Sequence, residues 1–160
     1  MFLKSFLSKS EVRIRITPNI EKAICEFAGT DKFAKALPAL ETAVRLTSEI
    51  RKDTLGGCQF FEKLSNGEVV KVNFNFEPIE DNTKATERVR ITDELQTDII
   101  NMAELLGCQS ANDDETKFVN ARPYILSAIN TATLLKEATE NGSKFLIKYA
   151  DGTKQLIRFM

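Results

Sequence analysis

Residues 59–74 (QFFEKLSNGEVVKVNF) and residues 144–159 (KFLIKYADGTKQLIRF) follow the same pattern. Each stretch contains two runs in which apolar and polar residues alternate, as expected of strands with one buried face. Asn66 and Gly67 separate the runs in the first stretch, and Asp151 and Gly152 separate them in the second. Asn-Gly and Asp-Gly are the strongest short-range signal for a β-hairpin with a type I′ turn, which needs positive φ angles. The sequence therefore predicts two hairpins of one design.

The two hairpins belong to a longer internal repeat. At an offset of 85 residues, positions 32–74 align with 117–159 without a gap, and 11 of these 43 positions are identical. Unrelated chains agree at about one position in fifteen. Upstream, an offset of 75 aligns 12–28 with 87–103, so the second copy carries ten extra residues. We expect residues 109–115 of this insertion to form an acidic, polar loop.

Each copy predicts the same series of elements. Residues 12–17 and 88–92 alternate with period two and are predicted strands. Thr17 precedes Pro18, and Thr92 precedes two acidic residues, so a helix is expected to begin at each threonine. A second helix is expected to begin or kink at Pro38 and Pro123, with 32–37 and 117–122 as a separate turn of helix. The fold class is therefore α+β: an internally duplicated βααββ unit, pseudo-two-fold symmetric, whose antiparallel sheets have helices on one face.

These elements divide the 160-residue chain into four segments. Residues 1–10 are an N-terminal extension, 11–76 the first repeat, 77–85 a linker and 86–160 the second repeat. One unit alone is marginal in size for a stable core, so we expect the repeats to share one compact domain. Two separate domains in tandem are the alternative.

Composition excludes several classes of function. The chain has 22 Lys and Arg, 23 Asp and Glu, and no His, so it lacks the commonest general base and zinc ligand. Its three cysteines form no CxxC pair, and its glycines form no nucleotide-binding loop. We expect no catalytic residues, no metal and no cofactor. The N-terminus has no signal-peptide core, and no run of residues is apolar enough to cross a membrane, so a cytoplasmic location is expected.

The strand and first helix of each copy resemble ribbon-helix-helix repeats of the Arc and MetJ type. The resemblance lies in VRIRITPNIEKAICEFAG (12–29) and ERVRITDELQTDIINMAELLG (87–107). In that family, alternate polar side chains of a paired strand enter the major groove of DNA. The resemblance implies nucleic-acid contacts at Arg13, Arg15, Thr17, Arg88, Arg90 and Thr92. The alternative is that these arginines line ordinary solvent-facing strands and pair with carboxylates.

The hairpins predict a second basic surface. If the Phe and Val residues at alternate positions face the core, the opposite face carries cations mixed with apolar side chains. This combination suits single-stranded nucleic acid, because cations track phosphates and rings stack on bases. The candidate residues are Phe61, Lys63, Lys71, Lys144, Lys148, Lys154 and Arg158. Solubilising lysines on exposed strands are the alternative.

The sequence thus favours a non-enzymatic nucleic-acid-binding protein, with single-stranded DNA slightly preferred over duplex. Lys63 and Lys148 are expected to extend the surface formed by the four arginines of the first strands. Two other interpretations stay open: a small protein-interaction or inhibitor module of phage type, and a duplex-binding transcription regulator of the ribbon-helix-helix kind. Self-association of the chain also stays open.

Overall fold

The computed structural model describes residues 13–85 and 87–159. The first half contains β1 (Arg13–Ile16), α2 (Pro18–Ala28), α3 (Phe33–Leu55), β2 (Gln59–Lys63) and β3 (Val69–Val72). The second half contains β4 (Glu87–Arg90), α4 (Asp93–Leu105), α5 (Asp114–Glu140), β5 (Lys144–Lys148) and β6 (Lys154–Ile157). The α+β class is confirmed, and both halves have the order strand, helix, helix, strand, strand.

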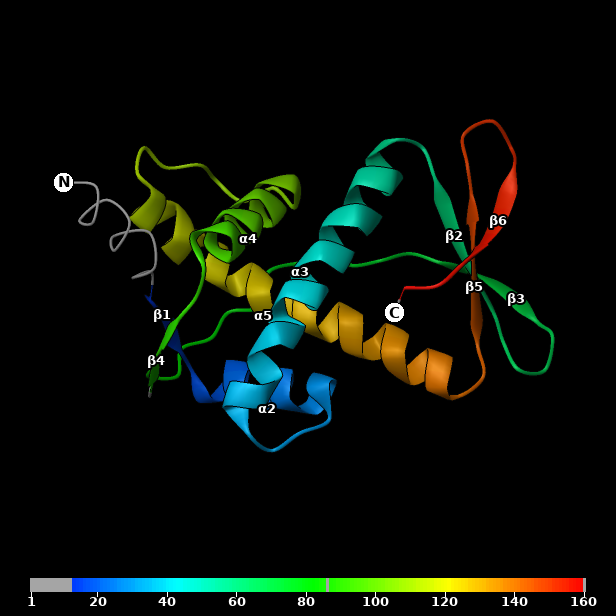
Figure 1. Cartoon of the computed structure of the whole chain (residues 1–160). Helices are drawn as coiled ribbons and strands as arrows, with labels where there is room; N and C mark the ends of the chain where they lie inside the picture. Colours follow the sequence, from blue (N-terminus) through cyan, green and yellow to red (C-terminus); the bar gives the residue numbers. More distant parts are fainter. Residues whose placement is uncertain (1–12, 86, 160) are drawn as a thin grey trace, which may run out of the picture.

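Two antiparallel sheets lie at opposite ends of a layer of helices (Figure 1). The first strands of the halves, β1 and β4, pair as a two-stranded ribbon. The remaining strands form a four-stranded sheet in the order β3-β2-β5-β6. Each half therefore contributes strands to both sheets, and the central pair of the larger sheet, β2 and β5, joins the two halves.

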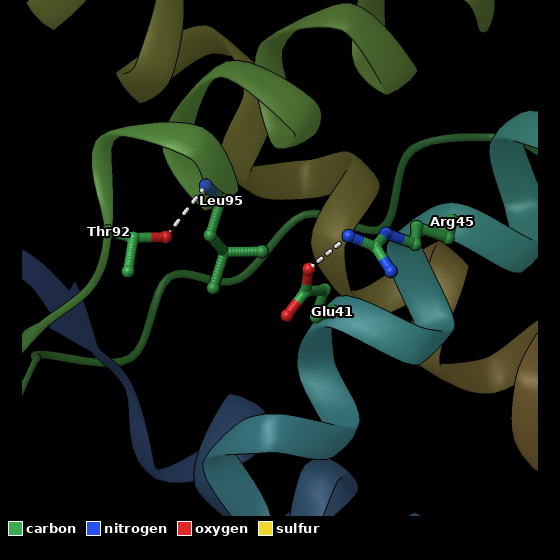
Figure 2. Close-up of polar contacts among 4 residues, drawn as sticks. All are labelled: Glu41, Arg45, Thr92 and Leu95. Atoms are coloured by element: carbon green, nitrogen blue, oxygen red, sulfur yellow. Dashed lines mark hydrogen bonds and ion pairs between the residues drawn. The ribbon is translucent and has the colours of Figure 1, made fainter.

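The helices that follow the ribbon begin where the sequence predicts. Thr17 and Thr92 have extended backbones, and their hydroxyls accept hydrogen bonds from the backbone N–H groups of Ile20 (3.2 Å) and Leu95 (3.1 Å). Figure 2 shows the second of these caps. Each cap satisfies a backbone donor that the first turn of a helix leaves open.

The predicted helix starts at Pro38 and Pro123 are wrong. α3 begins five residues before Pro38, and α5 begins nine residues before Pro123, so both prolines lie inside continuous helices. The predicted separate turns at 32–37 and 117–122 are consequently parts of α3 and α5. The physical reason lies in packing: Ala36 and Ala121, two residues before each proline, are fully buried. The core contacts of these first turns compensate for the backbone hydrogen bond that proline removes.

The loop predicted over residues 109–115 ends two residues earlier than expected, because α5 begins at Asp114. Asp113 is the N-cap of α5, and its side chain accepts a hydrogen bond from the backbone N–H of Thr116 (2.8 Å). Asp114 and Glu115 lie in the first turn of the helix, where negative charge is favourable. The acidic end of the predicted loop therefore stabilises a helix start.

The core draws residues from both halves and from both sheets. Ile14 and Ile16 of β1, Phe60 of β2, and Phe145 and Ile147 of β5 are all buried with the helix stripes. Phe74 and Phe159, which follow β3 and β6, pack edge-on against Phe60 and Phe145 with ring centroids 5.3 and 5.1 Å apart. The predicted inward face of the hairpins is confirmed by these contacts.

Both hairpins form, but their turns are not of type I′. The N–H of Gly67 donates to the carbonyl of Leu64, and that of Gly152 to Tyr149, each at 2.9 Å. Only the glycines have positive φ angles, 87° and 91°, and no other residue type does so in the described ranges. In each turn the preceding Asn or Asp accepts a hydrogen bond from the backbone N–H two residues later, at 2.9 Å. The result is a type I turn followed by a left-handed glycine.

Candidate nucleic-acid interface

The arginines of β1 and β4 share the exposed face of the ribbon. The register places Arg13 opposite Arg90 and Arg15 opposite Arg88, and all four side chains are exposed. The residues between them, Ile14, Ile16 and Val89, are buried or half-buried. We call this exposed face the arginine ribbon. Like charges directly opposite each other destabilise a strand pair. The ribbon therefore depends for its stability on the buried residues behind it.

Thr17 and Thr92 stand at the ends of the ribbon and serve as helix caps. The Thr17 hydroxyl also donates to the Asp81 carboxylate, which accepts further hydrogen bonds from Asn19 (3.1 Å) and from Thr83. Burial raises the pKa of Asp81, but the hydrogen bonds from Thr17, Thr83 and Asn19 lower it more, so the net pKa lies below its ordinary value. The segment between the halves is thereby tied to the start of α2.

The lysines of the hairpins share the outer face of the four-stranded sheet. Phe61 lies opposite Lys71 on one side and opposite Leu146 on the other, and Leu146 lies opposite Leu156. The same face carries the cross-strand pairs Lys63 with Lys144 and Lys148 with Lys154, and exposed Arg158 follows β6. We call this surface the lysine face. It has an apolar row, Phe61, Leu146 and Leu156, with lysines on both sides of it.

Acidic side chains are kept off the lysine face. Glu62, the acidic residue of β2, alternates with Phe61 and points to the opposite face, where it accepts a hydrogen bond from buried Ser143 (2.6 Å). No residue that the strand register places on the lysine face carries a carboxylate. The separation of charge therefore follows from the alternation of side chains along each strand.

The arginine ribbon and the lysine face are two separate surfaces. β1 and β4 lie at one end of the helical layer, and β2, β3, β5 and β6 lie at the other (Figure 1). The expectation that Lys63 and Lys148 extend the arginine surface is therefore wrong. It failed because residue alternation assigns a side chain to a face of its own sheet but says nothing about which sheet a strand joins.

Comparison with family models, with curated proteins and with solved structures finds no match. The chemistry of the two surfaces is consequently judged from their own residues. Within the described residues, no helix is long and apolar enough to span a bilayer. The same residues hold no group of three or more His, Cys, Asp or Glu side chains arranged to bind a metal ion.

One cation of the site was missed by the sequence reasoning. Arg122 of α5 lines a cavity together with Arg15 and Arg88 of the arginine ribbon. The repeat itself holds the signal that identifies Arg122, because the aligned residue 85 positions earlier is Leu37, an apolar residue packed against the core. Arginine is seldom buried in a core, so this position distinguishes the two halves.

Proposed function

We propose that this protein is a cytoplasmic, non-enzymatic nucleic-acid-binding protein that holds single strands on the lysine face. The observation that carries the proposal is the strand register, which gathers five lysines around Phe61 and two leucines on one face. Phosphates of a single strand attract such cations, and unstacked bases gain from contact with rings and apolar side chains. The apolar row is bordered by cations, whereas a protein-interaction module is expected to border it with acids.

Salt dependence tests the electrostatic part of the proposal. Binding of a labelled oligonucleotide is measured at several salt concentrations for the unmodified protein and for the double variant Lys148→Gln/Lys154→Gln, which neutralises one cross-strand pair. Each phosphate contact contributes about 0.7 to the log-log slope for single strands, so the variant should lose roughly 1.4. Lys22→Gln/Lys35→Gln removes the same charge from exposed helix positions and is the control, with an unchanged slope expected.

Phe61→Ala tests the stacking part. Loss of a stacked ring costs about 1–3 kcal/mol per base, so this variant should weaken single-strand binding and spare duplex binding. Equal binding of single strands by the unmodified protein and the Phe61 variant would show that the apolar row has no part in the contact. If the unmodified protein binds neither form at low salt, the interaction-module interpretation replaces this proposal.

A second candidate function, recognition of duplex DNA by a transcription regulator, is favoured by the pairing of β1 with β4. A two-stranded ribbon with outward-facing arginines has the dimensions and chemistry to enter a major groove, where Arg contacts guanine. Arg15→Gln/Arg90→Gln should then weaken duplex binding while Lys148→Gln/Lys154→Gln leaves it unchanged. If the lysine variant weakens duplex binding and the arginine variant does not, the lysine face binds duplex DNA as well.

A further inference from the structure

Arg122 is a half-buried cation with an unsatisfied donor. Its Nε is buried and makes no hydrogen bond among the described residues. Its guanidinium carbon lies 5.9 Å from the centroid of the Phe118 ring, one turn earlier in α5. Buried N–H groups are almost always hydrogen-bonded, and each exception needs an explanation. The ring contact favours the positive charge but leaves the donor open.

Two other half-buried cations of the chain donate to carbonyl groups. Lys136 lies over the Phe27 ring and donates to the Phe27 carbonyl (2.5 Å), and Arg51 Nε donates to the Leu105 carbonyl (3.2 Å). Lys136 thus combines the same kind of ring contact with a protein acceptor. Arg122 has the ring contact, but no acceptor among the described residues reaches its Nε, and its side chain lines an open cavity.

The surroundings of Arg122 are positively charged. Arg15 and Arg88, opposite each other in the ribbon, line the same cavity of about 350 Å³. Burial and the nearby charge of Arg15 both lower the pKa of Arg122 below its ordinary value. Glu115 is the acidic residue of the lining, yet no described ion pair joins it to any of these three arginines. Arg13 lines the cavity as well, and four cations around one hollow repel each other unless an anion separates them.

We propose that the cavity lined by Arg15, Arg88 and Arg122, here the arginine cavity, binds a phosphate group. Guanidinium groups hold phosphate through paired hydrogen bonds, and three of them neutralise its charge. The volume lies within the range of small-ligand pockets, and Gln96 and Val119 complete a wall for the group that carries the phosphate. The phosphate belongs either to a small molecule or to a nucleic-acid backbone. The site is independent of the lysine face and shares Arg15 and Arg88 with the arginine ribbon, whose Arg13 lines the same cavity.

Thermal unfolding tests the site with inorganic phosphate as the probe. At matched ionic strength, phosphate should raise the Tm of the unmodified protein relative to chloride, because it binds the folded state. Arg122→Gln should weaken phosphate binding about tenfold to hundredfold, as expected for loss of charged hydrogen bonds. In chloride the same variant should melt at or above the Tm of the unmodified protein, since it removes repulsion and an unsatisfied donor. If Arg122 had a purely structural role, Arg122→Gln would lower the Tm in chloride.

Three further variants control the experiment. Arg45→Gln removes an exposed arginine that pairs with Glu41 on α3 (Figure 2) and should keep the full phosphate shift. Arg88→Gln changes an exposed position of the arginine cavity and should lose the shift, even if Arg122→Gln fails to fold. Glu115→Gln removes the carboxylate of the lining and should tighten phosphate binding.

Two additional probes identify the source of the phosphate. A nucleoside monophosphate that binds more tightly than inorganic phosphate indicates a small phosphorylated ligand. Duplex DNA that is displaced by phosphate from the unmodified protein, but not from Arg122→Gln, indicates a backbone phosphate. The proposal is overturned if none of these probes shifts the Tm, or if Arg122→Gln retains the whole shift. Lys148→Gln/Lys154→Gln should retain the phosphate shift. This variant therefore distinguishes a failure of the lysine-face proposal from a failure of the phosphate-site proposal.

Discussion

The arginine ribbon and the lysine face carry similar charge on different frameworks. The ribbon has two strands, four guanidinium groups and, beneath them, isoleucines that anchor it to the helices. The lysine face has four strands and places ammonium groups on both sides of an apolar row. Arginine offers a planar set of donors suited to defined acceptors, and lysine offers a mobile point charge. Under the proposals above, the ribbon is therefore the geometrically selective surface and the lysine face the tolerant one.

Both surfaces combine strands from the two halves of the chain. β1 pairs with β4 and β2 pairs with β5, and in each case the two strands occupy corresponding places in the two copies. In the larger sheet this pairing is antiparallel, so the aligned residues Lys63 and Lys148 lie at opposite ends of the strand pair, where Lys63 faces Lys144 and Lys148 faces Gln59. Pairing strands from the two halves thus gathers their cations on one face of each sheet, and the core stabilises these sheets from behind.

The largest effect is expected from separating the halves. A fragment of residues 1–80 lacks β4, β5 and β6, and hence one strand of the ribbon and the inner partner of β2. It should show no cooperative thermal unfolding as a monomer, or should self-associate to replace the missing strands. Circular dichroism combined with sedimentation decides between these outcomes. A monomeric fragment with a sharp melt would contradict the shared core.

The next effect distinguishes the two faces of the larger sheet. Phe60 is 3% exposed and packs against Phe74, whereas Phe61, the next residue, is half-buried on the lysine face. Phe60→Ala should lower the free energy of unfolding by about 3–5 kcal/mol through the cavity it leaves. Phe61→Ala should cost clearly less. Urea denaturation of both variants measures the difference, and equal losses would show that Phe61 belongs to the core.

A smaller effect tests whether the two hairpins are equivalent. Gly67→Val and Gly152→Val force a β-branched residue into the left-handed region, at a cost of about 1–2 kcal/mol each. A Cβ at either glycine meets no atom within 4 Å, so the loss reports backbone strain alone. Gly67→Asn is the control, since Asn tolerates this conformation. Markedly unequal losses in the free energy of unfolding for the two valine variants would show that the two hairpins are not equivalent.

The smallest effect concerns the carboxylate beside the ribbon. Because the pKa of Asp81 is lowered in the folded protein, its ionised form stabilises the fold above the unfolded-state pKa, and this contribution is lost as the pH falls through the folded pKa. Asp81→Asn should therefore be less stable than the unmodified protein at neutral pH and equally stable in acid. Chemical denaturation across the carboxyl range measures the gap. A gap that widens in acid would contradict the assignment.

Local features of the fold were predictable from short stretches of sequence. Asn-Gly and Asp-Gly located both hairpins, and threonine followed by proline or acids located two helix starts. These signals are local because backbone hydrogen bonds to nearby residues decide them. The alternation of residues also assigned the lysine face correctly, since the two faces of a strand are fixed by its geometry.

Features that depend on distant partners were not predictable in this way. Pro38 and Pro123 lie inside helices because buried Ala36 and Ala121 hold the preceding turns against the core. The separation of the ribbon from the larger sheet depends on how the helices pack between them. Arg122 becomes part of a cavity only when α5 lies beside the ribbon, although its mismatch with the aligned Leu37 was visible in the sequence.

The pairing of β1 with β4 within one chain has a consequence for how the ribbon behaves on dilution. A ribbon assembled from two identical chains disappears when the protein concentration falls below the dimer dissociation constant. Here the two strands are covalently connected, so the ribbon persists at any concentration at which the chain is folded. The two strands also differ in sequence, RIRI against ERVR, and each is free to change alone. A target contacted by this ribbon has no need to be palindromic.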